Sequence, residues 1–215
     1  AAAVNGTLSR ASEPQTFLGK TFKLTQNINL NNELWTPIGR SSKHTETFRG
    51  TFDGQGHTIY NLRVDTEEGA GLFGMVSPKA IKNVTIENAV IKGNHFAGVL
   101  AGWIQSVDSQ AQNRVVIENC HVKNATVTVA VKDQDNGDKA GALLGYAVRV
   151  DVKECSVNRA EVVAYRDVAA LIGCAHEGCV VSGNSVNNVY VTADQSAEYV
   201  SVEAVNAGDI VGRTI

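Results

Sequence analysis

The chain has 215 residues, of which 43% are hydrophobic and 19% are charged. This is ordinary globular composition, which excludes a disordered or collagen-like chain, and the length allows one sizeable core. The net charge of −3 is scattered without a basic stripe, which disfavours a nucleic-acid partner. No apolar stretch is long enough to span a bilayer, so we expect membrane attachment only through an anchor outside this chain.

Residue usage favours strands and turns. The sequence contains 29 Val against 11 Leu, together with 20 Gly, 18 Asn and 3 Pro. Val is favoured on pleated sheets, whereas Gly and Asn serve turns that need a positive φ. The composition therefore predicts an all-β protein with many turns.

The amino-terminal part is predicted to contain a cap and the first strands. The segment from Ala1 to Gly6 resembles the last turn of a helix before a Gly stop. We interpret 1–16 as the remnant of a capping helix and expect the chain to be excised from a longer one. Residues 17–69 are predicted to form the first coils of a repetitive fold, with alternating apolar positions over 21–30, 35–39 and 48–59.

A short motif of small and apolar residues recurs over 70–215. Successive copies are separated by 28, 43, 28 and 39 residues, and they end at Gly74, Gly102, Gly145, Gly173 and Gly212. Since two intervals are equal, the motif marks a unit of fixed length, and the longer intervals contain insertions. We place these insertions at 105–114, 131–139 and 192–206.

A second motif keeps the same phase as the first. Residues 81–91 match 117–127, 152–162 and 181–191 position for position, with apolar residues alternating along each copy. Three strands and their turns in about 28 residues, repeated in register, describe one coil of a parallel β-solenoid. The sequence therefore predicts one single-stranded parallel β-helix domain over 1–215, with about six or seven coils.

Asn residues align in two columns when the copies are superposed. The columns hold Asn83 with Asn119, and Asn88 with Asn124 and Asn188. Stacked Asn side chains at a bend can bond one another and satisfy groups that the turn leaves unpaired. We favour such a structural ladder, and a role of Asn88 or Asn124 as a sugar or ion ligand is the alternative.

The four Cys residues fit neither a disulfide-dense scaffold nor a zinc ribbon. Cys120 and Cys155 share a column, and we interpret them as stacked buried thiols, with a disulfide as the alternative. The segment 174–179 holds three possible metal ligands without an evident fourth, so we favour an ordinary turn there. We expect no metal and no cofactor.

Two groups of residues are candidates for ligand binding. Trp103 and Tyr146 follow the final Gly in neighbouring copies of the first motif, and outward-facing aromatic rings can hold carbohydrate or peptide. The alternative is that they pack beneath the insertions. Asp133, Asp135 and Asp138 crowd one insertion, but their order does not fit a calcium loop of the EF-hand type, and a solvated turn is favoured.

The stretches 21–30, 35–39 and 48–62, followed by Gly71-Leu72-Phe73-Gly74, resemble the GLUG-repeat proteins. The resemblance extends over about 17–212, and such proteins occur on bacterial surfaces, especially in Bacteroides-type organisms. It implies a right-handed β-helix of the pectin-lyase-like kind and an exported, surface-attached parent. Some relatives in that family carry metallopeptidase parts, but their zinc-binding His-Glu-x-x-His motif is absent here, so no peptidase function is implied.

The sequence does not assemble a recognisable catalytic set, so we expect no enzymatic activity. The favoured function is a cell-surface or extracellular module for adhesion, which binds a host or bacterial glycan or protein through loops that project from the β-helix. One alternative is a carbohydrate-active enzyme, either a polysaccharide lyase or a glycosidase, of the pectin-lyase-like class. Another is a rigid spacer domain.

Overall fold

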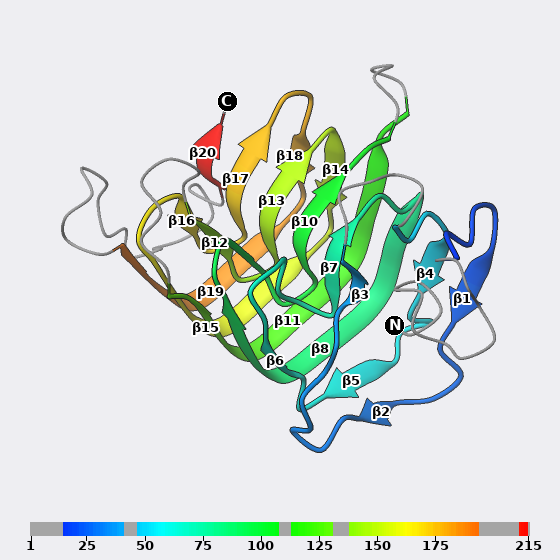
Figure 1. The fold of residues 1–215 in the computed structure, drawn as a ribbon, viewed down its shortest axis with the longest axis horizontal. Helices are drawn as coiled ribbons and strands as arrows, with labels where there is room; N and C mark the ends of the chain where they lie inside the picture. Colours follow the sequence, from blue (N-terminus) through cyan, green and yellow to red (C-terminus); the bar gives the residue numbers. More distant parts are fainter. Residues whose placement is uncertain (1–14, 41–46, 108–112, 131–137, 194–210, 215) are drawn as a thin grey trace.

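The computed structural model describes residues 15–40, 47–107, 113–130, 138–193 and 211–214. Within these residues the fold is all-β, as predicted, and it consists of three parallel sheets whose strands are visited in turn along the chain (Figure 1). The described part holds no helix, and so none that is long and apolar enough to cross a membrane. The predicted capping helix falls mainly on residues 1–14, outside the described part.

The largest sheet has eleven strands. They are β1 (Thr21–Lys23), β2 (Ile28–Asn29), β4 (Thr51–Asp53), β5 (Thr58–Tyr60), β6 (Arg63–Asp65), β8 (Ala80–Gly93), β11 (Val115–Val129), β14 (Val150–Lys153), β15 (Ser156–Ala164), β18 (Val180–Ser182) and β19 (Ser185–Ala193). Several of them, such as β14 and β15, are successive segments of the same side of one coil and pair with one long strand of the neighbouring coil.

A six-stranded sheet and a three-stranded sheet form the other sides of the coil. The first contains β3 (Ile38–Arg40), β7 (Phe73–Val76), β10 (Ala101–Gln105), β13 (Leu144–Val148), β17 (Ile172–His176) and β20 (Val211–Thr214). The second contains β9 (Phe96–Ala97), β12 (Lys139–Gly141) and β16 (Val168–Ala169). Because each turn of the chain adds one strand to the six-stranded sheet, the described residues form six coils, in line with the prediction.

The predicted inner columns are confirmed by the strand register. Ile117 pairs with Ile81 on one side and with Val152 on the other, and Val152 pairs with Val181. The first three are fully buried, whereas Val181 in the last of these strands is half-buried. Each coil therefore covers the apolar face of its neighbour, which an isolated coil could not bury.

Gly at the end of the first motif is required by close packing of backbone. A Cβ atom placed on Gly145 would lie 2.6 Å from the carbonyl oxygen of Gly102 and 2.7 Å from the amide nitrogen of Ala97. Real Cβ atoms do not approach other atoms so closely, so any larger residue would push the coils apart. The same motif supplies a buried column of Leu72, Leu100, Leu143 and Leu171, while its predicted fifth member, Ile210, lies outside the described residues.

Cys120 and Cys155 are buried free thiols in neighbouring coils, as interpreted from their shared column. Burial raises the pKa of the Cys120 thiol, and its contact with Cys155 acts in the same direction. Both side chains also lie near backbone carbonyl oxygens, which accept weak hydrogen bonds from them. They therefore fill the core as free thiols and form no covalent link between the coils.

Candidate functional site

One row of residues in the largest sheet adopts a left-handed backbone conformation at each coil. Its members have φ between 53° and 61°, and they are Asn61, Asn88, Asn124, Arg159 and Asn188. Asn is the non-Gly residue that tolerates this conformation best, because its short amide can bond locally. The left-handed row explains why Asn recurs in the second motif and where each long strand bends.

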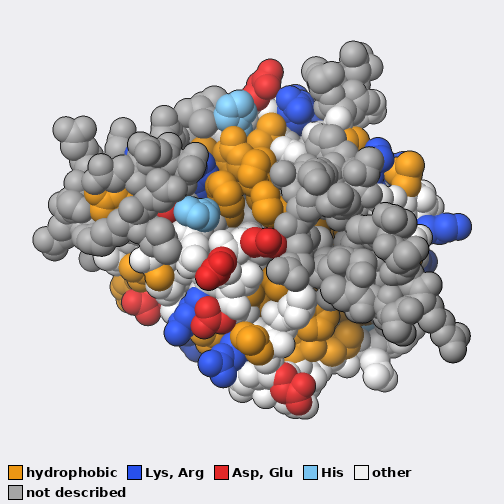
Figure 2. All heavy atoms as spheres, viewed as in Figure 1, with side chains coloured by type: hydrophobic (Ala, Val, Ile, Leu, Met, Phe, Trp, Pro, Cys, Tyr) orange, Lys and Arg blue, Asp and Glu red, His pale blue; other side chains and the backbone are white. Residues whose placement is uncertain are grey.

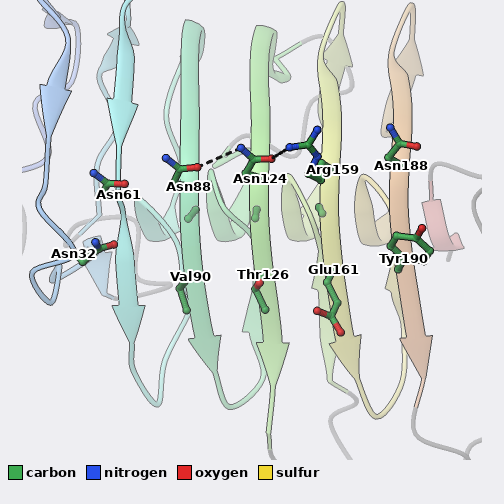
Figure 3. A pocket seen from close by; sticks show the side chains of 13 residues that line it. Asn32, Asn61, Asn88, Val90, Asn124, Thr126, Arg159, Glu161, Asn188 and Tyr190 are labelled. Carbon is green, nitrogen blue, oxygen red and sulfur yellow. Dashed lines mark hydrogen bonds between the residues drawn. The ribbon is translucent and has the colours of Figure 1, made fainter.

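The side chains of this row are bonded from coil to coil. Asn124 Nδ2 donates to Asn88 Oδ1 over 3.3 Å, and Arg159 Nη1 donates to Asn124 Oδ1 over 3.2 Å (Figure 3). Each of these bonds uses one hydrogen of its donor group, and an Asn amide carries two. The row is thus a ladder whose remaining polar atoms are available on the outer surface.

A surface groove of about 520 Å³ runs along this ladder and is called the amide groove here. A second row lies beside the ladder, two residues further along each strand, and its members are paired in register: Val90, Thr126, Glu161 and Tyr190. Both rows are visible in Figure 3. The described residues that line it are Asn32, Asn61, Asn88, Ala89, Val90, Asn124, Ala125, Thr126, Arg159, Ala160, Glu161, Asn188 and Tyr190.

The amide groove combines planar polar groups with one exposed ring. Tyr190 is 68% exposed and lies in the last of the strands that form the groove. Arg159 and Glu161 carry opposite charges two residues apart, and the other described residues that line the groove are uncharged. The groove therefore offers hydrogen-bond donors and acceptors in a repeating row without a net charge.

The other predicted Asn column also forms side-chain bonds. Asn119 Nδ2 donates to Asn83 Oδ1 over 3.0 Å, and Asn83 Nδ2 donates to Asp53 Oδ1 over 3.0 Å. Burial alone would raise the pKa of the Asp53 carboxyl. Hydrogen bonds from Asn83 and Gln55 outweigh that cost and hold this pKa at about 2. Asp53 is thus an ionised group that anchors the first rung of this column.

His121 links the same column to the next coil. Its Nδ1 lies 2.7 Å from Ser156 Oγ, and its Nε2 lies 2.9 Å from Asn119 Oδ1. Burial lowers the pKa of the imidazole, and the charge of Lys123 contributes in the same direction. The neutral ring therefore donates from one nitrogen and accepts at the other, which fixes three side chains in a chain across the sheet.

Trp103 and Tyr146 are brought together on the six-stranded sheet. They are paired in register on β10 and β13, and their ring centroids are 5.3 Å apart. Phe96 packs against both, at 5.0 Å from Trp103 and 5.7 Å from Tyr146. Figure 2 shows hydrophobic side chains gathered over this region, with His side chains at its margin. The two rings are half-buried, so each exposes a smaller fraction of its side chain than Tyr190 does.

Of the three acidic candidates, only Asp138 lies among the described residues. Asp133 and Asp135 lie outside the described residues, as do residues 108–112, 131–137 and 194–206 of the predicted insertions. Asp138 is fully buried, and its Oδ1 lies 3.9 Å from His95 Nδ1. In the described part of the chain, no three His, Cys, Asp or Glu side chains come close enough to hold a metal ion.

The amide groove was not recognised from the sequence as a candidate site. The sequence favours a structural ladder for the Asn row, with a ligand role of Asn88 or Asn124 as the alternative. Arg159, Glu161 and Tyr190 are not among the residues predicted to bind a ligand. The signal that could have found them is the position two residues after each column Asn, which alternation places on the outer face of the strand.

The sequence is similar to halomucin, a large surface protein of Haloquadratum walsbyi, with 31% identity over 112 residues. These residues are 51% of this chain and 1% of halomucin, so the similarity covers a small part of that protein. No protein-family model matches the sequence, and no solved structure matches it. The GLUG resemblance therefore stays a prediction, and the similarity to a surface protein agrees with the expected surface location.

Proposed function

We propose that this chain is a non-catalytic binding module of an exported surface protein, and that its amide groove holds an uncharged glycan chain. The observation that carries the proposal is the row of amide and guanidinium groups that recurs once per coil along the groove. Beyond the ladder bonds, Asn88 keeps two donor hydrogens and Asn124 keeps one, and each amide oxygen can accept a second bond, which suits ligands rich in hydroxyl groups. A polymer that lies along the stack would meet the same groups at each coil.

The charge of the groove favours a neutral ligand. Arg159 balances Glu161, and a polyanion would have to place its negative charges beside that carboxylate. A single cation is also too little to bind a phosphate backbone. The exposed ring of Tyr190 adds an apolar face on which a sugar ring can stack.

Binding is better supported than cleavage. Hydrolysis of a glycosidic bond uses two carboxyl groups that face each other across the sugar. Among the described residues that line the groove, Glu161 is the only acid. A carbohydrate-active enzyme and a rigid spacer remain the alternatives that experiment must separate from the binding module.

The test is a binding measurement with matched variants. The purified protein is applied to an array of neutral and acidic glycans, and the affinity for the best soluble glycan is then measured by calorimetry. Tyr190→Ala and Arg159→Ala should each weaken binding about fivefold or more, because each removes a contact worth roughly 1 kcal/mol. Asn158→Ala is the control, since Asn158 is exposed on the same strand but does not line the groove.

Each competing account predicts a different result in this experiment. Binding that survives both groove variants would place the site elsewhere, and binding to acidic glycans only would contradict the neutral-ligand assignment. Shortening of the glycan during the measurement would favour the enzyme. Failure to bind any glycan on the array would leave the spacer as the better account.

A further inference from the structure

Lys139 and Asp167 form a buried pair across the boundary between two coils. Lys139 is the first residue of β12, and Asp167 immediately precedes β16. Since Ala140 pairs with Val168, the two residues lie opposite each other in neighbouring coils. Lys139 Nζ is 3.8 Å from Asp167 Oδ2, and the two side chains are only 10% and 5% exposed.

Two aromatic rings lie beside the amino group. Lys139 Nζ lies 5.4 Å from the ring centroid of Phe96 and 5.4 Å from that of Tyr146. The backbone is fixed at the same place, because the Ala140 amide donates to the Asp167 carbonyl oxygen over 3.1 Å. The amine and the carboxyl group are thus held close together in a fixed orientation and largely away from water.

This arrangement is unfavourable for charges and favourable for their condensation. Removing an ammonium group and a carboxylate from water carries a large desolvation cost, which their attraction offsets only in part. An amide bond between them would eliminate both charges. Two reacting groups held in one orientation also behave as if they were present at very high concentration, so a reaction that is slow in solution becomes accessible.

We propose that Lys139 and Asp167 condense to form an intramolecular isopeptide bond. Lys139 Nζ attacks Asp167 Cγ, and one carboxyl oxygen leaves as water. The two hydrogens of that water come from the ammonium group, which keeps its third hydrogen in the new amide. The step needs no oxidant, metal or nucleotide, because the amine and the carboxyl group supply every atom.

The bond would join two successive coils covalently. The loop that it closes runs from Lys139 through β13, β14 and β15 to Asp167, which is one complete turn of the β-helix. The hydrogen bonds between β12 and β16 would then be reinforced by a link that denaturants do not break. This inference does not depend on the glycan-binding proposal, since the pair does not line the amide groove.

The test is the mass of the folded, reduced full chain. The expected mass is lower than the sequence mass by one water molecule, and proteolysis should give a branched peptide that joins the fragments containing Lys139 and Asp167. Fragment spectra of that peptide are needed because Asp53-Gly54 can also lose water, by cyclisation within the chain. The Lys139→Arg variant keeps a cation at this position but should lose no water there, and its digest should contain no branched peptide joining these two positions.

Asp167→Asn gives a second, independent signature. If this variant condenses, it loses ammonia instead of water, and the branched peptide has the same structure as in the natural protein. A natural chain at its full sequence mass would overturn the proposal and leave an ordinary buried ion pair. Loss of water that maps to another position, or that persists in Lys139→Arg, would overturn it as well. The mass of the natural chain decides the matter even if a variant fails to fold.

Discussion

His121 Nδ1 lies 2.7 Å from Ser156 Oγ, so the side chain of one coil is bonded directly to the next coil. Asn119 Oδ1 holds the other ring nitrogen at 2.9 Å. A protonated ring would be a donor at both nitrogens, and burial disfavours that charged form. Burial, with a smaller contribution from the charge of Lys123, therefore lowers the pKa of His121.

The free energy of unfolding should decrease as the pH falls below 6.5. Burial lowers the pKa of His121 from its ordinary value of 6.5, with a further contribution from Lys123. Between pH 6.5 and the lower pKa of His121 in the folded chain, the unfolded chain therefore binds a proton that the folded chain does not. The free energy of unfolding decreases across this range as the pH falls. Urea unfolding on both sides of pH 6.5 measures the effect. His121→Gln should reduce the slope, and an unchanged slope would contradict the assignment.

A second loss of stability is expected in acid. The pKa of Asp53 is lowered to about 2 from 3.8, because hydrogen bonds from Asn83 and Gln55 outweigh the burial that raises it. The folded chain then resists protonation, so stability is present above 3.8 and decreases as the pH falls toward about 2. At neutral pH, Asp53→Asn should lower the free energy of unfolding by about 1–3 kcal/mol. Asp65→Asn, at an exposed position, is the matched control and should change it little.

Two substitutions of Asn124 separate backbone strain from hydrogen bonding. Both Asn124→Gly and Asn124→Ala remove the amide that bonds Asn88. Only Ala is strained at φ of 53°, so Asn124→Ala should be less stable than Asn124→Gly by roughly 1 kcal/mol. Chemical denaturation of the two variants gives the difference directly. If the Gly variant were the less stable one, the left-handed conformation would not be what selects Asn here.

Gly145→Ala should be strongly destabilising. The added Cβ would meet the carbonyl oxygen of Gly102 at 2.6 Å, and backbone atoms cannot turn away as a flexible side chain can. We expect a cost of about 2 kcal/mol or more, seen as a lower midpoint in thermal or urea unfolding. Ser185→Ala, at an exposed position of β19, serves as the control. Equal stability of the two variants would show that the coils can separate without cost.

The repeat made most of the fold predictable. Ile81, Ile117 and Val152 occupy one column in the aligned copies, and the strand register places them in the same column of the core. Coils stack in register because each one must cover the apolar face of the next, so aligned copies translate directly into spatial neighbours. The bends were predictable for the same reason, since Asn88 and Asn124 mark a backbone conformation that few residues adopt.

The groove could not be predicted in the same way. Its second row consists of Val90, Thr126, Glu161 and Tyr190, which share a position but no chemistry, so an alignment of copies shows nothing at that column. The pairing of Lys139 with Asp167 was hidden for a different reason. One residue lies at the edge of a predicted insertion and the other in a repeat, so only the strand register brings them opposite each other.

The direction of the backbone hydrogen bonds between coils makes the resistance of this molecule to force depend on the direction of pulling. These bonds point along the stack, because successive coils are neighbouring strands of the same sheets. A force that lifts the last coil from the end of the stack breaks these bonds one after another, so only a few resist at any moment. A force along the strands instead loads the 12 residue pairs of β8 and β11 together. The protein should therefore peel easily from its ends, yet resist shear across its width.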